Sequence, residues 1–133
     1  MKLIIGGAAQ GKRDYAREQF GRGRYLDGSC CSREELYREK GVYDFQLWIR
    51  KRMQEEKEPF QEGGKERLLE QCRAILQENP EIVIICNEVG CGLVPIEQTD
   101  RQYRDLVGEI CVWLAKEAEE VHRVICGIGR RIK

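Results

Sequence analysis

The amino-acid sequence predicts an α/β sandwich, with a mostly parallel sheet and helices on both of its faces. Two observations predict it. Segments typical of strands alternate with segments typical of amphipathic helices, and the segment 82–86 is apolar at every position. A strand that is apolar on both faces is typical of a parallel sheet covered on each side. The length of 133 residues favours one domain that spans residues 1–133.

The first part of the chain predicts two strands and two helices. Residues 2–6 form a short apolar run that ends in glycine, which is typical of a buried strand leading into a tight loop. A helix is expected over 13–20, and a short second strand over 24–26. Ser32 followed by Glu35 is a capping-box pattern, which predicts the start of a short helix.

The middle of the chain predicts two amphipathic helices. From Tyr43 onward the apolar residues recur at helical spacing, and Pro59 is expected to end this helix. The second helix follows the pair Gly63–Gly64 and ends at Asn79–Pro80. The apolar positions are Phe45, Trp48, Ile49 and Met53 in the first helix, and Leu68, Leu69, Cys72, Ile75 and Leu76 in the second.

The next segments predict a buried strand and a long helix. Residues 82–87 are the clearest strand of the chain, and a glycine-containing loop follows over 88–98. Thr99 with Gln102 forms a second capping-box pattern, so the helix is expected to begin there. Its apolar positions are Tyr103, Leu106, Val107, Ile110 and Leu114.

The remaining residues predict the last main strand over 121–126, a turn at 127–129 and a short edge strand over 130–133. In mostly parallel sheets, ligands bind at the carboxyl ends of the strands. Two loops rich in glycine, 6–11 and 88–92, are expected at those ends. We therefore look for function there.

Composition and charge exclude several classes of function. The 23 basic and 23 acidic side chains cancel, which argues against a domain-wide basic surface for nucleic acid or anionic lipid. The longest apolar run in mid-chain is far shorter than the ~20 residues of a membrane span. The start shows no signal-peptide pattern, and the seven cysteines include no C-x-x-C motif, as in reduced intracellular proteins. We therefore expect a cytoplasmic protein with no nucleic-acid partner and no membrane span.

The loop after the first predicted strand carries a phosphate-binding motif. It matches the pattern G-x-x-x-x-G-K and departs at the next position, where Arg13 replaces the usual serine or threonine that holds Mg²⁺. Small residues let backbone N–H groups surround a phosphate, and Lys12 can reach the terminal phosphates. The alternative is a glycine-rich turn with a surface lysine. The expected phosphate-binding residues are Gly6, Gly7, Ala8, Ala9, Gln10, Gly11, Lys12 and Arg13.

Carboxylates that follow other predicted strands are candidates for catalysis or metal binding. Glu88 comes directly after the buried strand, where it could orient water around Mg²⁺ or accept a proton from a hydroxyl, or instead cap nearby loop amides. Asp27 is a second metal candidate, although a turn residue explains it better from local sequence. His122 is the only histidine, and we expect it to be structural or on the surface because no metal-ligand spacing surrounds it.

Three stretches of the sequence together resemble a known family. They are the first loop from Gly6 to Lys12, the string Asn87-Glu88-Val89-Gly90-Cys91-Gly92-Leu93-Val94-Pro95, and the ending from Val124 to Lys133. On these motifs the chain resembles the adenosylcobinamide kinase / adenosylcobinamide-phosphate guanylyltransferase family of cobalamin biosynthesis. The resemblance covers about the first 20 and the last 50 residues, and the middle matches weakly.

The resemblance implies a P-loop-type three-layer sandwich that binds GTP or ATP at the first loop, with Mg²⁺ and a corrinoid substrate. It implies phosphorylation of the aminopropanol hydroxyl of adenosylcobinamide, followed by GMP transfer to the product. It also implies a homo-oligomer, with a trimer as the expected form. Gly6, Gly11 and Lys12 match its phosphate-binding positions, and Lys12 and Glu88 are the expected catalytic residues, with Asp27 and Glu88 as metal candidates.

Two departures from the family pattern bear on the expected activity. The family's guanylylated histidine lies in the helical region after the second strand, but residues 29–57 contain no histidine, so covalent GMP transfer has no visible nucleophile. Arg13 replaces the Mg²⁺-binding hydroxyl. The alternative function is therefore a non-catalytic protein that binds nucleotide or corrinoid in the same pocket. A third possibility is GMP transfer by direct attack of the corrinoid phosphate on GTP.

Overall fold

The computed structural model describes residues 1–55, 63–90 and 97–133, and its centre is a six-stranded sheet. The strands are β1 (Lys2–Gly6), β2 (Tyr25–Asp27), β3 (Gly41–Tyr43), β4 (Val83–Asn87), β5 (Glu120–Ile125) and β6 (Ile128–Arg131). Their order is β2-β3-β4-β1-β5-β6, and only β5 and β6 pair antiparallel. This confirms the predicted mostly parallel sheet. The expected helix end at Pro59 and the loop positions 91–95 lie outside the described residues.

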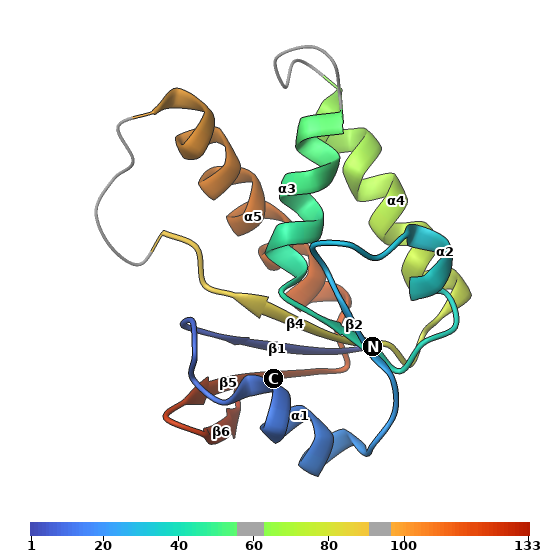
Figure 1. The fold of residues 1–133 in the computed structure, drawn as a ribbon, viewed down its shortest axis with the longest axis vertical. Coiled ribbons are helices and arrows are strands. Elements are labelled where there is room, and N and C mark those ends of the chain that lie inside the picture. Colours follow the sequence, from blue (N-terminus) through green and yellow to red (C-terminus); the bar gives the residue numbers. More distant parts are fainter. Residues whose placement is uncertain (56–62, 91–96) are drawn as a thin grey trace.

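Helices lie on both sides of the sheet (Figure 1). They are α1 (Lys12–Phe20), α2 (Arg33–Leu36), α3 (Phe45–Glu55), α4 (Gly64–Glu78) and α5 (Gln98–Glu117). Helix α1 covers one face, while α3, α4 and α5 lie on the other. The three-layer α/β sandwich predicted from the sequence is thus confirmed. None of the helices in the described ranges is long and apolar enough to cross a membrane.

The sheet divides the apolar core into two parts. In β1, Leu3 packs with the cluster of the α3–α5 side and Ile4 with the cluster of the α1 side. The segment Val83–Cys86 of β4 is buried at every position, as expected for a strand covered on both faces. On the larger side, the fully buried Trp48 stacks on Phe45 with ring centroids 5.1 Å apart.

The register of the parallel strands brings their carboxyl ends to one edge of the sheet. Gly6 at the end of β1 pairs with Asn87 at the end of β4, and Asp27 pairs with Tyr43 at the end of β3. Loops that follow parallel strands leave the sheet at this edge, which is where α/β proteins bind their ligands. The loop after β1 therefore meets the residues that follow β3 and β4.

Strand β3 differs from the prediction. The sequence predicts a helix from Tyr43, but Tyr43 ends β3 and α3 begins at Phe45. The prediction was wrong because Gly41–Tyr43 is too short to show a period of its own; the strand forms by pairing with β2 and β4. Asp44 separates the strand from the helix with a φ of 52°, a left-handed conformation that neither element uses.

The two predicted capping boxes have different outcomes. The one at Ser32 is present, since its side chain accepts from the N–H of Glu35 and the Glu35 side chain accepts from the N–H of Ser32. The one at Thr99 is wrong, because a helix capped by Thr99 would begin at residue 100, whereas α5 begins at Gln98. Its N-cap is Glu97, with no side-chain cap bond within the described ranges.

The edge strand begins earlier than expected. Strand β6 starts at Ile128, not at residue 130, because the turn before it has only two residues. These residues, Cys126 and Gly127, have φ values of 51° and 79°. Two consecutive residues with positive φ are typical of a type I′ hairpin, whose twist matches the flanking strands.

Candidate phosphate-binding site

Two glycines hold the loop after β1 close to the β5–β6 hairpin. A Cβ atom at Gly6 would lie 2.4 Å from the carbonyl oxygen of Val124, closer than packing allows. At Gly11, whose φ is 82°, a Cβ atom would lie 3.0 Å from the Cα atom of Gly127. Glycine at these two motif positions therefore lets the loop approach the hairpin and turn into α1.

Gln10 joins the loop to the same hairpin. Its side-chain Oε1 accepts a hydrogen bond from the backbone N–H of Cys126 at 2.7 Å. Its carbonyl oxygen accepts one from the N–H of Gly127 at 2.8 Å. The shape of the loop is thus stabilised by residues 126–127. Sequence reasoning missed this role because the partner is 116 residues away.

Lys12 begins α1 and its ammonium group lies across the loop. The residue is only 6% exposed, and its Nζ donates to the carbonyl oxygen of Gly7 at 2.5 Å. Burial lowers the pKa of Lys12, and the nearby charge of Asp44 opposes that shift. A buried ammonium that bonds to a neutral carbonyl can transfer its bond to a phosphate, whose charge would offset the cost of burial.

A cavity of about 390 Å³ opens beside this loop. The loop and the start of α1 line it over residues 8–14, and the ends of β3 and β4 contribute Tyr43, Asp44 and Asn87. The first N–H groups of a helix have no partners within the helix, so the start of α1 presents donors suited to an anion. The arrangement fits a polyphosphate group.

Asp44 is an acidic residue of this cavity that the sequence analysis misses. Its Oδ1 accepts hydrogen bonds from Nε2 of Gln46 and from Nδ2 of Asn87, each at 3.2 Å. A carboxylate directly after a parallel strand is a site candidate. No sequence signal identified the strand Gly41–Tyr43, however, so nothing placed Asp44 at the edge of the sheet.

Arg13, the residue that departs from the motif, is anchored to the residues that follow β3. Its Nη2 lies 2.6 Å from Oδ2 of Asp44. Its guanidinium carbon lies 3.4 Å from the centre of the Tyr43 ring. The ion pair holds the edge of the guanidinium group and the ring holds its face.

Glu88 lies at the same edge of the sheet but not among the residues that line the loop cavity. Its backbone N–H donates to the carbonyl oxygen of Gly6 at 3.1 Å. Its carboxylate pairs with Arg123 on β5, with 3.1 Å between Oε1 and Nε. Its negative charge still acts on Lys12, raising the pKa of that lysine, although less than burial lowers it. The catalytic and metal-binding roles expected of Glu88 stay predictions.

Asp27 forms its shortest hydrogen bonds within its own turn. One carboxylate oxygen accepts from the hydroxyl and the backbone N–H of Ser29, at 2.6 and 2.8 Å. These bonds lower the pKa of Asp27, and the Tyr43 hydroxyl and the charge of Arg13 lower it further. The turn-residue interpretation accounts for this geometry, and the metal role of Asp27 stays a prediction.

Mg²⁺ in nucleotide sites needs one or two protein oxygens beside those of the phosphates, and here Arg13 replaces the hydroxyl that usually supplies one of them. Over residues 1–55, 63–90 and 97–133, no group of three or more His, Cys, Asp or Glu side chains is placed to hold a metal. Both carboxylate oxygens of Asp44 already accept hydrogen bonds, one of them from Arg13.

His122 is buried on the α1 side of the sheet, in agreement with the structural role expected of it. Its Nδ1 lies 2.8 Å from the Tyr15 hydroxyl, and its Nε2 lies 2.8 Å from a Glu120 oxygen. Its ring packs edge-to-face with that of Phe20, with centroids 5.1 Å apart. Through Tyr15 and Phe20 the ring joins β5 to α1, while its contact with Glu120 lies within β5.

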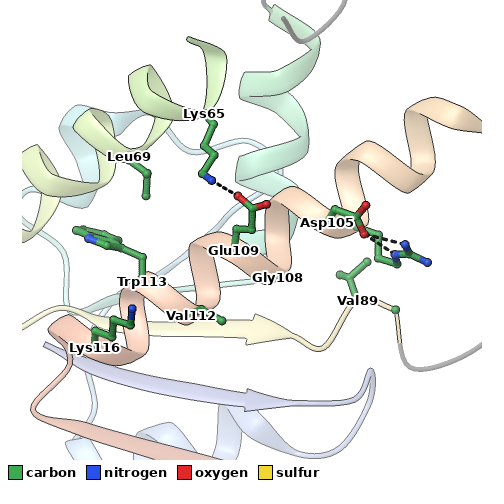
Figure 2. Close-up of a pocket in the computed structure, with 11 residues that line it drawn as sticks. Lys65, Leu69, Val89, Asp105, Gly108, Glu109, Val112, Trp113 and Lys116 are labelled. Atoms are coloured by element: carbon green, nitrogen blue, oxygen red, sulfur yellow. Dashed lines mark hydrogen bonds and ion pairs between the residues drawn. The ribbon is translucent and has the colours of Figure 1, made fainter. Parts of the chain in front are cut away.

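A wider hollow of about 770 Å³ lies along α4 and α5 (Figure 2). Leu69 and Trp113 supply apolar surface, and Lys65 on α4 pairs with Glu109 on α5. Val89, just after β4, lines the end of the hollow nearest the carboxyl edge of the sheet. This surface can take a large, partly apolar molecule.

The loop, the lysine and the sheet together define a class of protein. A glycine-rich loop connects the central strand β1 to α1, and the buried Lys12 begins that helix. These features define a P-loop α/β protein. Residues 41–132 match the family described as "Cobinamide kinase / cobinamide phosphate guanyltransferase". The chain belongs to this family, as its sequence motifs predict. The match begins after the phosphate loop, which is assigned from its motif and geometry.

Two curated relatives show the same similarity. The "Bifunctional adenosylcobalamin biosynthesis protein CobU" of Salmonella typhimurium (strain LT2) and that of Escherichia coli (strain K12) are each 43% identical to this chain over 53 residues. The aligned stretch covers 40% of this chain and 29% of each relative. The similarity thus extends over less than a third of the relatives' length.

Proposed function

We propose that the protein is a nucleotide-dependent kinase that phosphorylates the aminopropanol hydroxyl of adenosylcobinamide, with GTP or ATP as the phosphoryl donor. Membership of the cobinamide kinase family supports the corrinoid acceptor. The observation that supports nucleotide binding is the placement of Lys12. Its buried ammonium group is held across a glycine-rich loop at a helix N-terminus.

In the proposed reaction the terminal phosphoryl group passes from the nucleotide to the acceptor hydroxyl. The bond between the terminal phosphorus and the nucleoside diphosphate breaks, a bond to the acceptor oxygen forms, and the hydroxyl proton is released. The loop N–H groups and Lys12 stabilise the charge of the phosphoryl and leaving groups. Glu88 positions the acceptor hydroxyl or takes its proton. Because Arg13 replaces the usual Mg²⁺-binding hydroxyl, every step proposed here is assigned to the protein's own residues.

The hollow along α4 and α5 is the proposed binding site of the corrinoid. A corrin ring is broad and partly apolar, with amide groups around its edge, which suits the Leu69–Trp113 surface and its charged rim. The hollow also begins at Val89, the residue next to Glu88. We expect Trp113→Ala to raise the KM for adenosylcobinamide several-fold and to leave the KM for the nucleotide unchanged. Equal changes in both KM values would contradict this placement.

Two further features of the family carry over only as proposals. Because residues 29–57 offer no histidine, GMP transfer would proceed by direct attack of a corrinoid phosphate oxygen on the α-phosphorus of GTP, with the α–β phosphoanhydride bond broken and pyrophosphate released. A homo-oligomer, with a trimer as the expected form, is supported by three exposed isoleucines near β6, of which Ile128 is 77% exposed. The other two are Ile125 and Ile132.

The test of the kinase is incubation with adenosylcobinamide, Mg²⁺ and GTP or ATP, followed by mass analysis of the corrinoid. We expect a phosphorylated product that the Lys12→Ala variant does not form, although the variant stays folded by circular dichroism. Full activity of Lys12→Ala would refute the proposed mechanism. Nucleotide binding with an unchanged corrinoid would favour the alternative, a non-catalytic binding protein.

A further inference from the structure

Arg13 places a cation where phosphate loops usually carry a metal ligand. The position after the motif lysine normally presents a hydroxyl to Mg²⁺. Here the guanidinium group occupies the wall of the same cavity as Lys12. Asp44 at 2.6 Å and the Tyr43 ring at 3.4 Å hold it there. An arginine fixed on two sides loses little conformational freedom on binding an anion.

The carboxylate beside the cavity is already neutralised by this arginine. Asp44 gives Oδ2 to Arg13, and its Oδ1 accepts from the amide groups of Gln46 and Asn87. The guanidinium thus lies directly against Asp44 and balances its charge. An arginine carries its charge at every physiological pH, whereas a bound ion depends on its concentration.

The two neighbouring cations also point to an anionic ligand. Burial is the largest cause of the lowered pKa of Lys12; the charge of Asp44 opposes that shift, and the charge of Arg13 adds the smallest lowering. Asp44 pairs directly with only one of the two cations, so the second favours an anionic ligand in the cavity. The guanidinium has five N–H donors in one plane, which match the spacing of phosphate oxygens.

We propose that the Arg13 guanidinium, held by Asp44 and Tyr43, takes the place of a protein-bound Mg²⁺, so that the loop binds a nucleoside triphosphate without a divalent cation. The inference rests on the proposed nucleotide-binding function and adds to it the source of the positive charge. It makes Arg13 the residue that determines the metal dependence of binding.

The experiment is isothermal titration calorimetry of the full chain with ATP and with GTP, in Mg²⁺ and in EDTA. We expect the wild-type Kd to differ by less than about threefold between the two buffers. Arg13→Thr restores the usual motif hydroxyl and removes the cation. Its Kd should rise by at least about tenfold in EDTA, as expected for a lost charge-assisted hydrogen bond, and recover when Mg²⁺ is added.

Two variants complete the test. Arg17→Thr is the matched control, because Arg17 lies on the same helix with a side chain 53% exposed, against 50% for Arg13, and does not line the cavity. It should bind like wild type in both buffers. Asp44→Asn removes the ion pair that holds Arg13 but no metal ligand, so it should change the Kd by the same factor in both buffers. Asparagine tolerates the φ of 52° found at this position, so this variant should fold.

The outcomes separate this inference from the proposed function. Binding by wild type that weakens by tenfold or more in EDTA overturns the inference and leaves the nucleotide-dependent function standing. The same follows if Arg13→Thr behaves like wild type in both buffers, or if Asp44→Asn loses affinity only in the Mg²⁺ buffer. The absence of any nucleotide binding in either buffer overturns both.

Discussion

The two sides of the sheet differ in what they contribute. The side covered by α3, α4 and α5 holds most of the buried apolar residues, including Trp48 and Ile110. The side covered by α1 has a small apolar cluster and holds polar contacts such as that of Tyr15 with His122. The phosphate loop leads directly into this single helix. The difference suggests that the larger side provides stability, while the smaller side shapes the loop.

The largest expected effect lies on the larger side. Trp48→Ala removes a fully buried ring that stacks on Phe45, and should lower the free energy of unfolding by about 3–5 kcal/mol in urea titrations. Trp48→Phe should cost clearly less, because the indole Nε1 is buried without a hydrogen-bond partner among the described residues. The nucleotide affinity of the folded Trp48→Phe protein should stay that of wild type. A large loss of nucleotide affinity in Trp48→Phe would contradict the proposal that the α3–α5 side provides stability while the α1 side shapes the loop.

A medium effect is expected on the smaller side. Gly6→Ala forces a Cβ atom against the carbonyl oxygen of Val124, so it should lower the free energy of unfolding by about 1–3 kcal/mol and also weaken nucleotide binding. Gly108→Ala on α5 is the control, since its Cβ atom would meet nothing within 4 Å and it lies outside the loop cavity. Chemical denaturation and calorimetry measure the two effects. Unchanged affinity in Gly6→Ala would show that the loop does not depend on this close approach.

The smallest effect concerns acid stability on the same side. The hydrogen bond from His122 is the main cause that holds the pKa of Glu120 below the ordinary value of 4.5 for a glutamate side chain. A carboxylate with a lowered pKa stabilises the folded state above its unfolded pKa, and this contribution is lost as the pH falls through its folded pKa. Glu120→Gln should therefore flatten part of the decline in melting temperature below about pH 4.5. Glu117→Gln, at an exposed position of α5, is the control. An unaltered pH profile for Glu120→Gln would contradict this assignment.

Much of the fold follows from local sequence signals. The apolar runs at β1 and β4 and the helical spacing of α3, α4 and α5 are strong because each element buries a face of its own. Strand β3 was missed because its three residues are stabilised by neighbouring strands. Because strand β3 was not predicted, Asp44 was not among the predicted site residues.

The candidate site likewise contains residues that local sequence predicts and residues that it does not. The glycines and Lys12 are predictable because the physics of phosphate binding requires them at fixed spacing. The partners of Arg13 and Gln10 are not, because they lie 31 and 116 residues away in the chain. Only the fold brings such residues together, and no local pattern records them.

The place of β1 in the middle of the sheet has a consequence for synthesis on the ribosome. Lys2 pairs with Val83 on one side and with Glu120 on the other, and Gln10 needs the turn at 126–127. At the usual speed of translation, these partners emerge on the order of ten seconds after the first strand. Residues 6–12 are therefore synthesised well before the contacts that fix the conformation of the loop can form. Until then, the first strand is an apolar segment without neighbours, of the kind that chaperones protect.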